Sequence, residues 1–299
     1  MNDHLLPVHS APELAAVQLP PRETILDPIL ANDSLALLYG PRGLGKTFVA
    51  LGIARAAAAG ESFLGWRATR PHRVLFVDGE MSAIDMQQRL ALFGPPPPSL
   101  DFMLAHFNRG RSLDLSHHES HRRLMMSWDN PELVVLDNLA SLAGFRSGDA
   151  DRWHELQRFL VVQRQLGRAV LMVHHANKRG LQRGSSRRED LLDLVLAMRR
   201  PPEWLPGDAT SFEIHFEKAR RLHSADVAPI EVRMEDDAAS NCLRWHWQPI
   251  GDPVFDRAVA LFECGTGAVD VARAMGISRA SAYRLRERAV RLKRLPALS

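Results

Sequence analysis

The sequence predicts an α/β fold, a doubly wound and mainly parallel sheet with an antiparallel extension, followed by a small all-α domain. Four short apolar runs of strand length alternate with longer segments of helical character, and this order is typical of a parallel sheet with helices on both faces. Three later segments alternate apolar and polar residues instead, as antiparallel strands do. The tail contains three short helical segments broken by glycines, which predicts the all-α domain.

We expect three parts: an N-terminal arm over residues 1–22, a body over 23–250 and a tail over 251–299. The arm is rich in proline and alanine, and it is either disordered or packed on a neighbouring subunit. Residues 252–299 carry nine basic against five acidic residues, while the whole chain has a net charge of only +3. A basic tail on a near-neutral body predicts that the tail meets a polyanion.

The composition is that of a globular protein. The chain has 299 residues, of which 45% are hydrophobic, enough to bury a sizeable core. No apolar run approaches the roughly 20 residues that span a bilayer, and the N-terminus lacks the pattern of a signal peptide. We therefore expect a cytoplasmic protein without a membrane partner. Cys242 and Cys264 stand far apart, so neither a disulfide framework nor a thiolate metal site is indicated.

The first apolar run, Leu35–Gly40, leads into a glycine-rich turn and an alanine-rich helix. Strand, turn and helix surround the pattern GxxxxGK[ST], which in this setting predicts a phosphate-binding loop rather than a chance glycine-rich turn. We expect Gly40, Gly43 and Gly45 to adopt positive φ and turn backbone N–H groups toward a triphosphate. The predicted nucleotide contacts are Gly40, Pro41, Arg42, Gly43, Leu44, Gly45, Lys46, Thr47 and Phe48.

Polar side chains in and after these runs suit ATP and Mg²⁺. Lys46 is expected to reach the β- and γ-phosphates and Thr47 to hold Mg²⁺. Asp137 ends the third run, and we expect it to bind Mg²⁺ through water or to order Thr47. The next residue is Asn138 rather than the glutamate that serves as base in many ATPases, so the general base must come from elsewhere. Glu80, just after the second run, is the best-placed candidate, and a solvated loop acid is the alternative.

Histidines give two weaker signals. His175 follows the fourth run, Ala169–Val173, and is a candidate for a hydrogen bond to the γ-phosphate, with a capping histidine as the alternative. His117, His118 and His121 have a spacing that suits a metal ion, but no cysteine and no HExxH pattern accompany them. A solvated helix face is therefore favoured over a zinc site.

The remaining elements follow from the same patterns. We expect helices at 82–93 and at about 151–166, a helix ending near Trp128, and a strand near 102–107. The antiparallel strands are expected near 211–219, 227–233 and 243–248. Trp245 and Trp247 lie in the last of these, where packing is favoured over a stacking platform for bases.

The segments GPRGLGKT, VLFVDGE, VVLDN, VHHANK and QRGSS occur in an order that resembles the RecA-type ATPases of the plasmid RepA hexameric helicase group, which are related to the DnaB and KaiC cores. The resemblance covers roughly residues 25–233. It implies a RecA-like fold, ATP with Mg²⁺, and a homo-oligomer, a ring of six with ATP at each subunit boundary. It also implies Glu80 as catalytic glutamate, His175 as γ-phosphate sensor, Arg183 as an arginine finger acting on the neighbouring subunit, and Lys218, or Arg220, as a second residue acting in trans.

The tail reads as helices at 254–263, 268–275 and 279–291. Ala272 and Gly276, four residues apart, supply the small residue and the turn glycine of a helix-turn-helix. The segment VARAMGISRASAYRL resembles the resolvase/invertase helix-turn-helix. The resemblance implies that Ser278 caps the last helix and that DNA is contacted by Arg279, Ser281, Tyr283 and Arg284. A helical bundle used only for packing is the alternative.

Two function classes fit these patterns. One is a DNA-dependent ATPase motor, a replicative or mobile-element helicase that draws single-stranded DNA through a ring, with residues 177–188 tracking the backbone. The other is a DNA-binding ATP switch, a regulator, loader or recombination accessory, whose nucleotide state controls assembly without unwinding.

Overall fold

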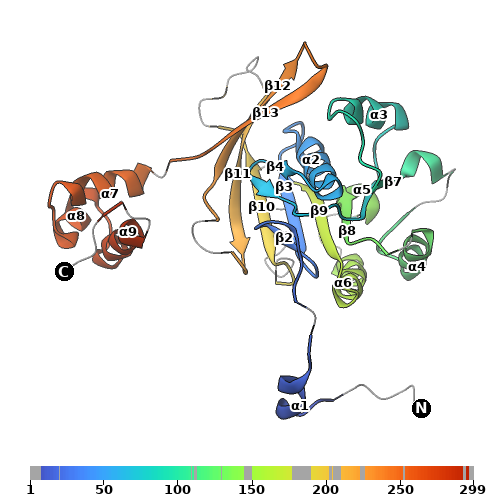
Figure 1. Cartoon of the computed structure of the whole chain (residues 1–299), viewed down its shortest axis with the longest axis horizontal. Helices are drawn as coiled ribbons and strands as arrows, with labels where there is room; N and C mark the ends of the chain where they lie inside the picture. The colour runs from blue at the N-terminus through green and yellow to red at the C-terminus, as the bar shows by residue number, and fades with distance from the viewer. Residues whose placement is uncertain are drawn as a thin grey trace. The chain divides into compact units, whose positions relative to one another are not determined.

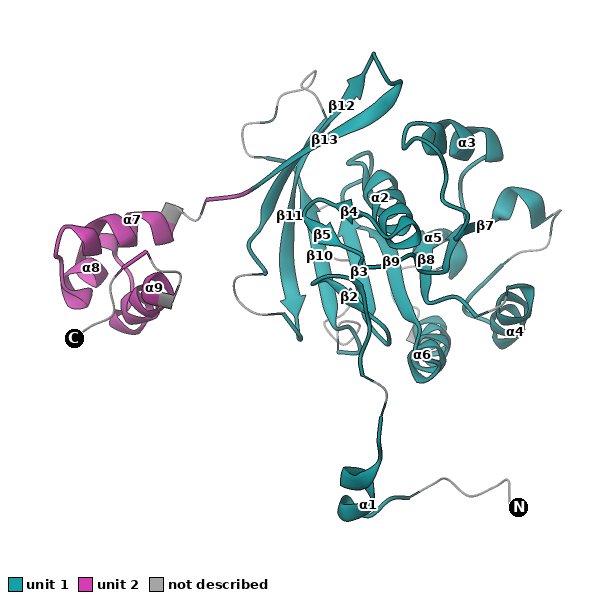
Figure 2. Cartoon of the chain, viewed as in Figure 1, with its two compact units in different colours: residues 1–248 teal, residues 249–299 magenta. Residues whose placement is uncertain are grey.

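The computed structural model describes residues 8–19, 21–108, 110, 113–128, 130–144, 150–176, 190–201, 204, 210–222, 226–251, 253–291 and 294–295. The chain forms two compact units, residues 1–248 and residues 249–299 (Figures 1 and 2). The larger unit contains the sheet and the smaller one contains three helices, and each is described here by itself.

A nine-stranded sheet organises the larger unit, in the order β13-β12-β11-β10-β3-β9-β8-β6-β7. The six strands from β10 to β7 are parallel, whereas β11 is antiparallel to β10 and β12 is antiparallel to β11. The predicted parallel sheet with an antiparallel extension is therefore confirmed. The strands are β3 (Leu35–Gly40), β6 (Val74–Asp78), β7 (Leu100–Leu104), β8 (Leu133–Asp137), β9 (Ala169–His175), β10 (Leu194–Arg199), β11 (Thr210–Ala219), β12 (Ile230–Asp237) and β13 (Cys242–Pro249).

Helices cover both faces of the sheet, as a doubly wound fold requires. Alternate residues of β3 face opposite layers: Ala36 and Leu38 join the core that contains α2, and Leu35 and Leu37 join the core that contains α5 and α6. Two small hairpins, β1–β2 and β4–β5, complete this unit together with the shorter helices. The bounds are α2 (Lys46–Ala59), α3 (Ala83–Ala91), α4 (His118–Ser127), α5 (Leu139–Leu142), α6 (Ala150–Gln165), η1 (Ala105–Asn108), β1 (Thr24–Leu26), β2 (Leu30–Ala31), β4 (Ser62–Phe63) and β5 (Trp66–Arg67).

Several elements were not predicted, among them strand β10 and helix α1. Strand β10 is buried between β3 and β11 in the middle of the sheet, although its apolar run directly follows a long polar segment that hides it. Helix α1 (Ala11–Ala16) lies in the segment that showed little periodicity. Its capping box, in which Glu13 N–H donates to Ser10 Oγ and Ser10 N–H donates to Glu13 Oε2, was readable as the pattern Ser-x-x-Glu. No residue of α1 is buried.

Side-chain packing corrects the expectation for His121 and agrees with the expectation for Trp245. His121 does not lie on a solvated face: it is 6% exposed, its Nε2 is 2.7 Å from the carbonyl oxygen of Leu115 and its ring lies against Phe159. Trp245 packs as expected, with ring centroids 4.8 Å from Phe63 and 6.0 Å from Phe93. Within the described ranges, no group of three or more His, Cys, Asp or Glu side chains is placed to hold a metal ion.

The smaller unit consists of α7 (Pro253–Glu263), α8 (Ala268–Met275) and α9 (Arg279–Arg291). Its core contains Val271, Ala272 and Ala282, with the partly buried Met275, Ile277 and Leu285 against it. Gly276 ends α8 in the left-handed region at φ 66°, which costs glycine little. Ser278 Oγ accepts the Ser281 N–H at 3.1 Å and so caps the start of α9. The helix-turn-helix assignment itself stays a prediction.

In the part of the chain that the structure describes, each helix is too short or too polar to cross a lipid bilayer.

Candidate nucleotide-binding site

The loop between β3 and α2 has the backbone shape that a phosphate-binding loop needs. Gly43 and Gly45 adopt φ of 74° and 89°, values that residues with a Cβ rarely adopt. Gly40 differs from the expectation, because it has no positive φ. A Cβ at Gly40 would lie 2.7 Å from the carbonyl oxygen of Met198, so this glycine allows β3 and β10 to approach closely.

Lys46 begins α2 and points back into the loop. Its Nζ donates a hydrogen bond to the carbonyl oxygen of Pro41 at 2.6 Å, and the residue is only 5% exposed. Burial lowers the pKa of Lys46 to about 8, against the opposing charge of Asp137. The ammonium group is therefore held at a backbone carbonyl of the loop, on the wall of the cavity described next.

A cavity of about 310 Å³ lies beside this loop, at the carboxyl ends of the parallel strands. The loops after β3, β6, β8 and β9 all contribute to it, because parallel strands end at the same edge of a sheet. The cavity brings together five of the candidate residues from the sequence: Lys46, Thr47, Glu80, Asp137 and His175. It is lined by Gly43, Gly45, Lys46, Thr47, Phe48, Asp78, Glu80, Met81, Arg89, Asp137, Asn138, His175, Thr210 and Met234.

Asp137 supplies a buried carboxylate to this cavity. It is 3% exposed, and its Oδ2 has no hydrogen-bond partner among the described residues. Burial raises the pKa of Asp137 to about 6, and a hydrogen bond with Thr47 opposes the rise. A buried carboxylate oxygen without a partner is costly, and a hard cation held by oxygen ligands removes that cost. Asp137 and Thr47 therefore fit Mg²⁺.

Asp78 shapes the loop that carries Glu80. Its Oδ1 accepts the backbone N–H groups of Glu80 at 3.0 Å and of Met81 at 2.6 Å. Burial raises the pKa of Asp78, and these two hydrogen bonds oppose the rise. Asp78 thus fixes the turn that brings the Glu80 side chain over the cavity.

Glu80, Asn138 and His175 form a hydrogen-bonded row across the strand ends. Asn138 Nδ2 lies 2.5 Å from Glu80 Oε2 and 3.4 Å from His175 Nε2. Asn138 Oδ1 accepts the N–H groups of Ala140 and Ser141, at 3.0 and 3.2 Å, where α5 begins. The sequence placed Glu80 and His175 here but gave Asn138 no role.

Arg89 is a further charged residue that sequence reasoning missed. It lies on α3 with its guanidinium carbon 4.9 Å from the centre of the Phe48 ring, and Phe48 also stacks on Phe93. The available signal was its place on an amphipathic helix directly after the Glu80 loop. Arg89 adds a positive charge to a wall of the cavity.

Several predicted contacts do not line the cavity. Gly40, Pro41, Arg42 and Leu44 are absent from its lining, and Leu44 is a core residue instead. Lys218 is paired with Val195 in the sheet and does not line the cavity either. Arg183 lies outside the described residues.

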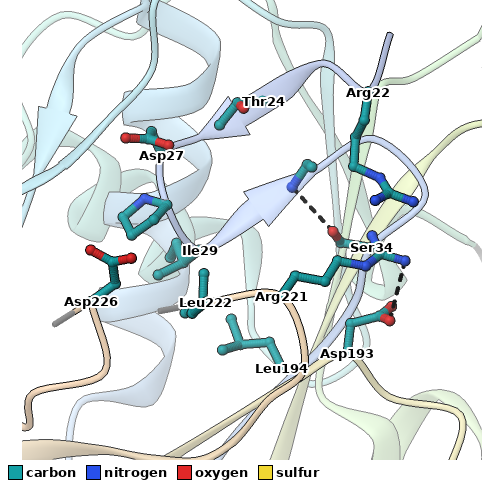
Figure 3. A pocket seen from close by; sticks show the side chains of 12 residues that line it. Arg22, Thr24, Asp27, Ile29, Ser34, Asp193, Leu194, Arg221, Leu222 and Asp226 are labelled. Atoms are coloured by element: carbon teal, nitrogen blue, oxygen red, sulfur yellow. Dashed lines mark hydrogen bonds and ion pairs between the residues drawn. The ribbon is translucent and has the colours of Figure 1, made fainter. Parts of the chain in front are cut away.

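A second cavity of about 420 Å³ lies at the amino ends of β3 and β10. Figure 3 shows Arg221 facing Asp193, a pair with a 3.3 Å contact. Arg221 also pairs with Asp33 at 2.7 Å, and Asp33 with Arg22 at 2.9 Å. These ion pairs connect the chain before β1, the start of β3 and the chain after β11. Because the charged side chains neutralise one another, we assign this cavity a structural role.

A phosphate-binding loop, a buried carboxylate beside its threonine and a parallel sheet that presents both at its carboxyl edge define a P-loop nucleoside triphosphatase. Residues 5–180 match a family model described as an AAA domain. Since this match covers more than half of the chain, the protein belongs to that family and is a P-loop ATPase.

The fold is similar to that of a KaiC-like protein from the hyperthermophilic archaeon Pyrococcus horikoshii OT3. The TM-score is 0.51 at 17% sequence identity, over 74% of this chain and 93% of that chain. This likeness confirms the predicted RecA-like fold. A search of curated proteins found no match.

Proposed function

We propose that the protein is an ATP-hydrolysing, homo-oligomeric DNA-binding motor, a replicative or mobile-element DNA helicase of the RepA type. The observation that carries its ATPase chemistry is the meeting of Lys46, Thr47, Glu80, Asp137 and His175 at one cavity. The motor assignment adds to this the order of sequence segments and the basic C-terminal unit.

The side chains divide the work of phosphoryl transfer. Bound Mg²⁺ supplies positive charge that neutralises the phosphate oxygens, and Thr47 and Asp137 would hold it. Lys46 leaves the Pro41 carbonyl for the phosphates. Glu80 accepts the proton of the attacking water, and His175 forms a hydrogen bond to the γ-phosphate. Positioning and charge stabilisation account for most of the rate in such a reaction.

We propose further that each site is completed by a neighbouring copy in a ring of six. Arg183 would act as the arginine finger and Lys218 as a second cation in trans, as the family resemblance implies. A trans arginine contributes about 10³- to 10⁵-fold in rate. Hydrolysis would then depend on assembly.

The C-terminal unit supports DNA as the partner. Arg279 and Arg284 are exposed on α9 and have no ion-pair partner within the described part of the chain, and Tyr283 is 51% exposed. Three other arginines of the unit are engaged: Arg286 and Arg288 lie over the rings of Phe262 and Phe255, and Arg273 pairs with Asp270. The exposed groups at the start of α9 are those proposed to face DNA, together with Ser281.

A DNA-binding ATP switch is the second candidate. The observation that favours it is that the three helices have a core of their own, so this unit can recognise duplex DNA while the nucleotide state of the larger unit controls assembly only.

One set of measurements separates the two candidates. Mass photometry with and without ATP tests assembly, and ATPase and strand-displacement assays with single-stranded, duplex and tailed DNA test the motor, with Lys46→Ala as the inactive control. Hydrolysis stimulated by single-stranded DNA with unwinding supports the motor. Duplex-specific binding without unwinding supports the switch. A protein that stays monomeric with ATP and hydrolyses it at full rate would refute the shared sites.

A further inference from the structure

The orientation of the Asn138 amide is fixed by its surroundings. Its Oδ1 accepts two backbone N–H groups at the start of α5, from Ala140 and Ser141. A side-chain NH₂ group cannot accept hydrogen bonds, so the opposite orientation of the amide is excluded. The NH₂ group must therefore face the two atoms on its other side, Glu80 Oε2 at 2.5 Å and His175 Nε2 at 3.4 Å.

This arrangement exceeds what capping a helix requires. The Oδ1 atom alone satisfies the N–H groups of α5, and serine or aspartate caps a helix as well as asparagine does. Only an amide combines such an acceptor with two N–H donors on the opposite side. The residue is 4% exposed, so these donors would be costly without partners. Glu80 and His175 are those partners.

We propose that Asn138 is a positioning residue that holds Glu80 and connects its position to the state of His175. This inference rests on the proposed roles of Glu80 as base and His175 as γ-phosphate sensor. Because the amide donates, His175 Nε2 accepts, so the neutral ring carries its proton on Nδ1. The same Nε2 cannot donate to a phosphate oxygen while it accepts from Asn138.

The consequence is a direct connection between nucleotide contact and base position. When His175 turns its ring or changes tautomer to donate to the γ-phosphate, it releases one N–H of Asn138. Among the described residues, the side-chain NH₂ group of Asn138 then has Glu80 as its one remaining partner, and the Glu80 carboxylate moves toward the N–H that His175 has released. Two residues that are 95 positions apart in sequence thus respond to the same event through one amide.

The test uses two substitutions that keep a capping oxygen and remove the two amide N–H donors. Asn138→Ser retains a capping oxygen, and Asn138→Asp retains the shape but turns a carboxylate oxygen toward Glu80. Ser141→Ala is the matched control, because it removes the hydrogen bonds from Ser141 Oγ to the Asn138 carbonyl oxygen at 2.9 Å and to Oδ1 at 3.5 Å, and leaves the NH₂ group with Glu80 and His175. All are measured in the full chain.

We expect Asn138→Ser to lower kcat about 10- to 100-fold, the usual effect of losing a residue that orients an active group. Asn138→Asp should lower it at least as much because of repulsion from Glu80. KM and the affinity for a fluorescent ATP analogue should change less than about twofold, since neither donor contacts the phosphates. Ser141→Ala should behave as the wild type. Variants at Asn138 with wild-type kcat would overturn the proposal, because a cap is all that they retain.

A second readout does not depend on hydrolysis. ¹⁵N NMR of histidine-labelled protein without nucleotide reports the tautomer of His175, assigned by the loss of its signals in His175→Gln. The wild type should show an unprotonated Nε2, and Asn138→Asp should move the proton to Nε2. An unchanged tautomer would refute the connection. Absent hydrolysis by the wild type, together with the expected tautomer change, would instead refute the proposed reaction and leave the hydrogen-bonded row intact.

Discussion

Asp78 and Asp137 are register partners at the ends of the neighbouring parallel strands β6 and β8, so two buried carboxyl groups lie side by side beside the phosphate-binding loop. The two carboxyl groups differ in their hydrogen-bond partners. Asp78 accepts two backbone N–H groups, whereas Oδ2 of Asp137 has no partner among the residues described. One carboxylate therefore fixes a loop, and the other is available to a cation.

This difference predicts that Asp137→Asn stabilises the protein without nucleotide. Burial raises the pKa of Asp137 to about 6, so at pH 7.5 the folded chain holds a carboxylate in an unfavourable place. Removing the charge should add about 1–3 kcal/mol to the free energy of unfolding, which raises Tm by several degrees. Thermal unfolding of the wild type and the variant, with and without Mg²⁺-ATP, measures this change in Tm. The variant should also lose the stabilisation by Mg²⁺-ATP; a lower Tm without nucleotide would contradict the assignment.

A mixing experiment tests whether the sites are shared between copies. Lys46→Ala should abolish ATP binding, and Arg183→Ala should lower turnover about 10³-fold or more. In a mixture, a copy with an intact Lys46 can lie beside a copy with an intact Arg183, so some sites are complete. ATPase activity of the mixed variants should exceed that of either alone. A purely additive result would show that Arg183 does not act across a subunit boundary.

The parts predicted from sequence are those whose signals are local. The phosphate-binding loop, Asp137 and Glu80 each directly follow a short apolar run, and the common edge of a parallel sheet then brings them together. The three helices of the smaller unit were predicted for the same reason, since glycines separate them. Strand β10 was missed because its run is short and adjoins a polar segment, although it lies in the centre of the sheet.

The hydrogen bonds of Asn138 could not be predicted from the sequence, because they depend on the atomic positions at the ends of three different strands. The sequence shows only that an asparagine follows Asp137, and nothing in its neighbours indicates that Glu80 and His175 approach it from β6 and β9. The role of Gly40 was similarly hidden, because the close approach to Met198 depends on β10. Local patterns identify groups, whereas contacts between loops decide how the groups are held.

Stability in acid should depend on Glu132, which connects the segments before β6 and β8. Burial alone would raise the pKa of Glu132, but hydrogen bonds from Arg70, the Arg73 N–H and His72 lower it to about 2, from 4.5. A lowered pKa contributes stability above pH 4.5 that is lost as the pH falls toward 2. Urea unfolding should show Glu132→Gln about 1–3 kcal/mol less stable than the wild type at pH 6. The difference should shrink between pH 4.5 and 2, and a constant difference would contradict it.

Gly52 in α2 should not tolerate alanine. In most helices this change stabilises by about 1 kcal/mol, but a Cβ at Gly52 would collide with the ring of Phe63. We expect Gly52→Ala to cost about 1–3 kcal/mol through overpacking, measured by urea unfolding. Adding Phe63→Leu should recover part of the loss by opening space, even though Phe63→Leu alone destabilises. A Gly52→Ala protein more stable than the wild type would show that α2 and β4, which carries Phe63, separate easily.

Arg284→Ala tests how the smaller unit meets DNA. Arg284 is exposed, and its only recorded hydrogen bond among the described residues is to Ser281 Oγ at 3.2 Å, so its charge is available to a phosphate or a base. Each phosphate contact contributes about one unit to the slope of log K against log salt. Fluorescence anisotropy over a salt series should therefore show weaker binding and a slope smaller by about one. Arg273→Ala removes the same charge from α8, where Asp270 pairs with it at 3.1 Å, and should keep the slope. Equal effects would mean that net charge alone, rather than the start of α9, attracts DNA.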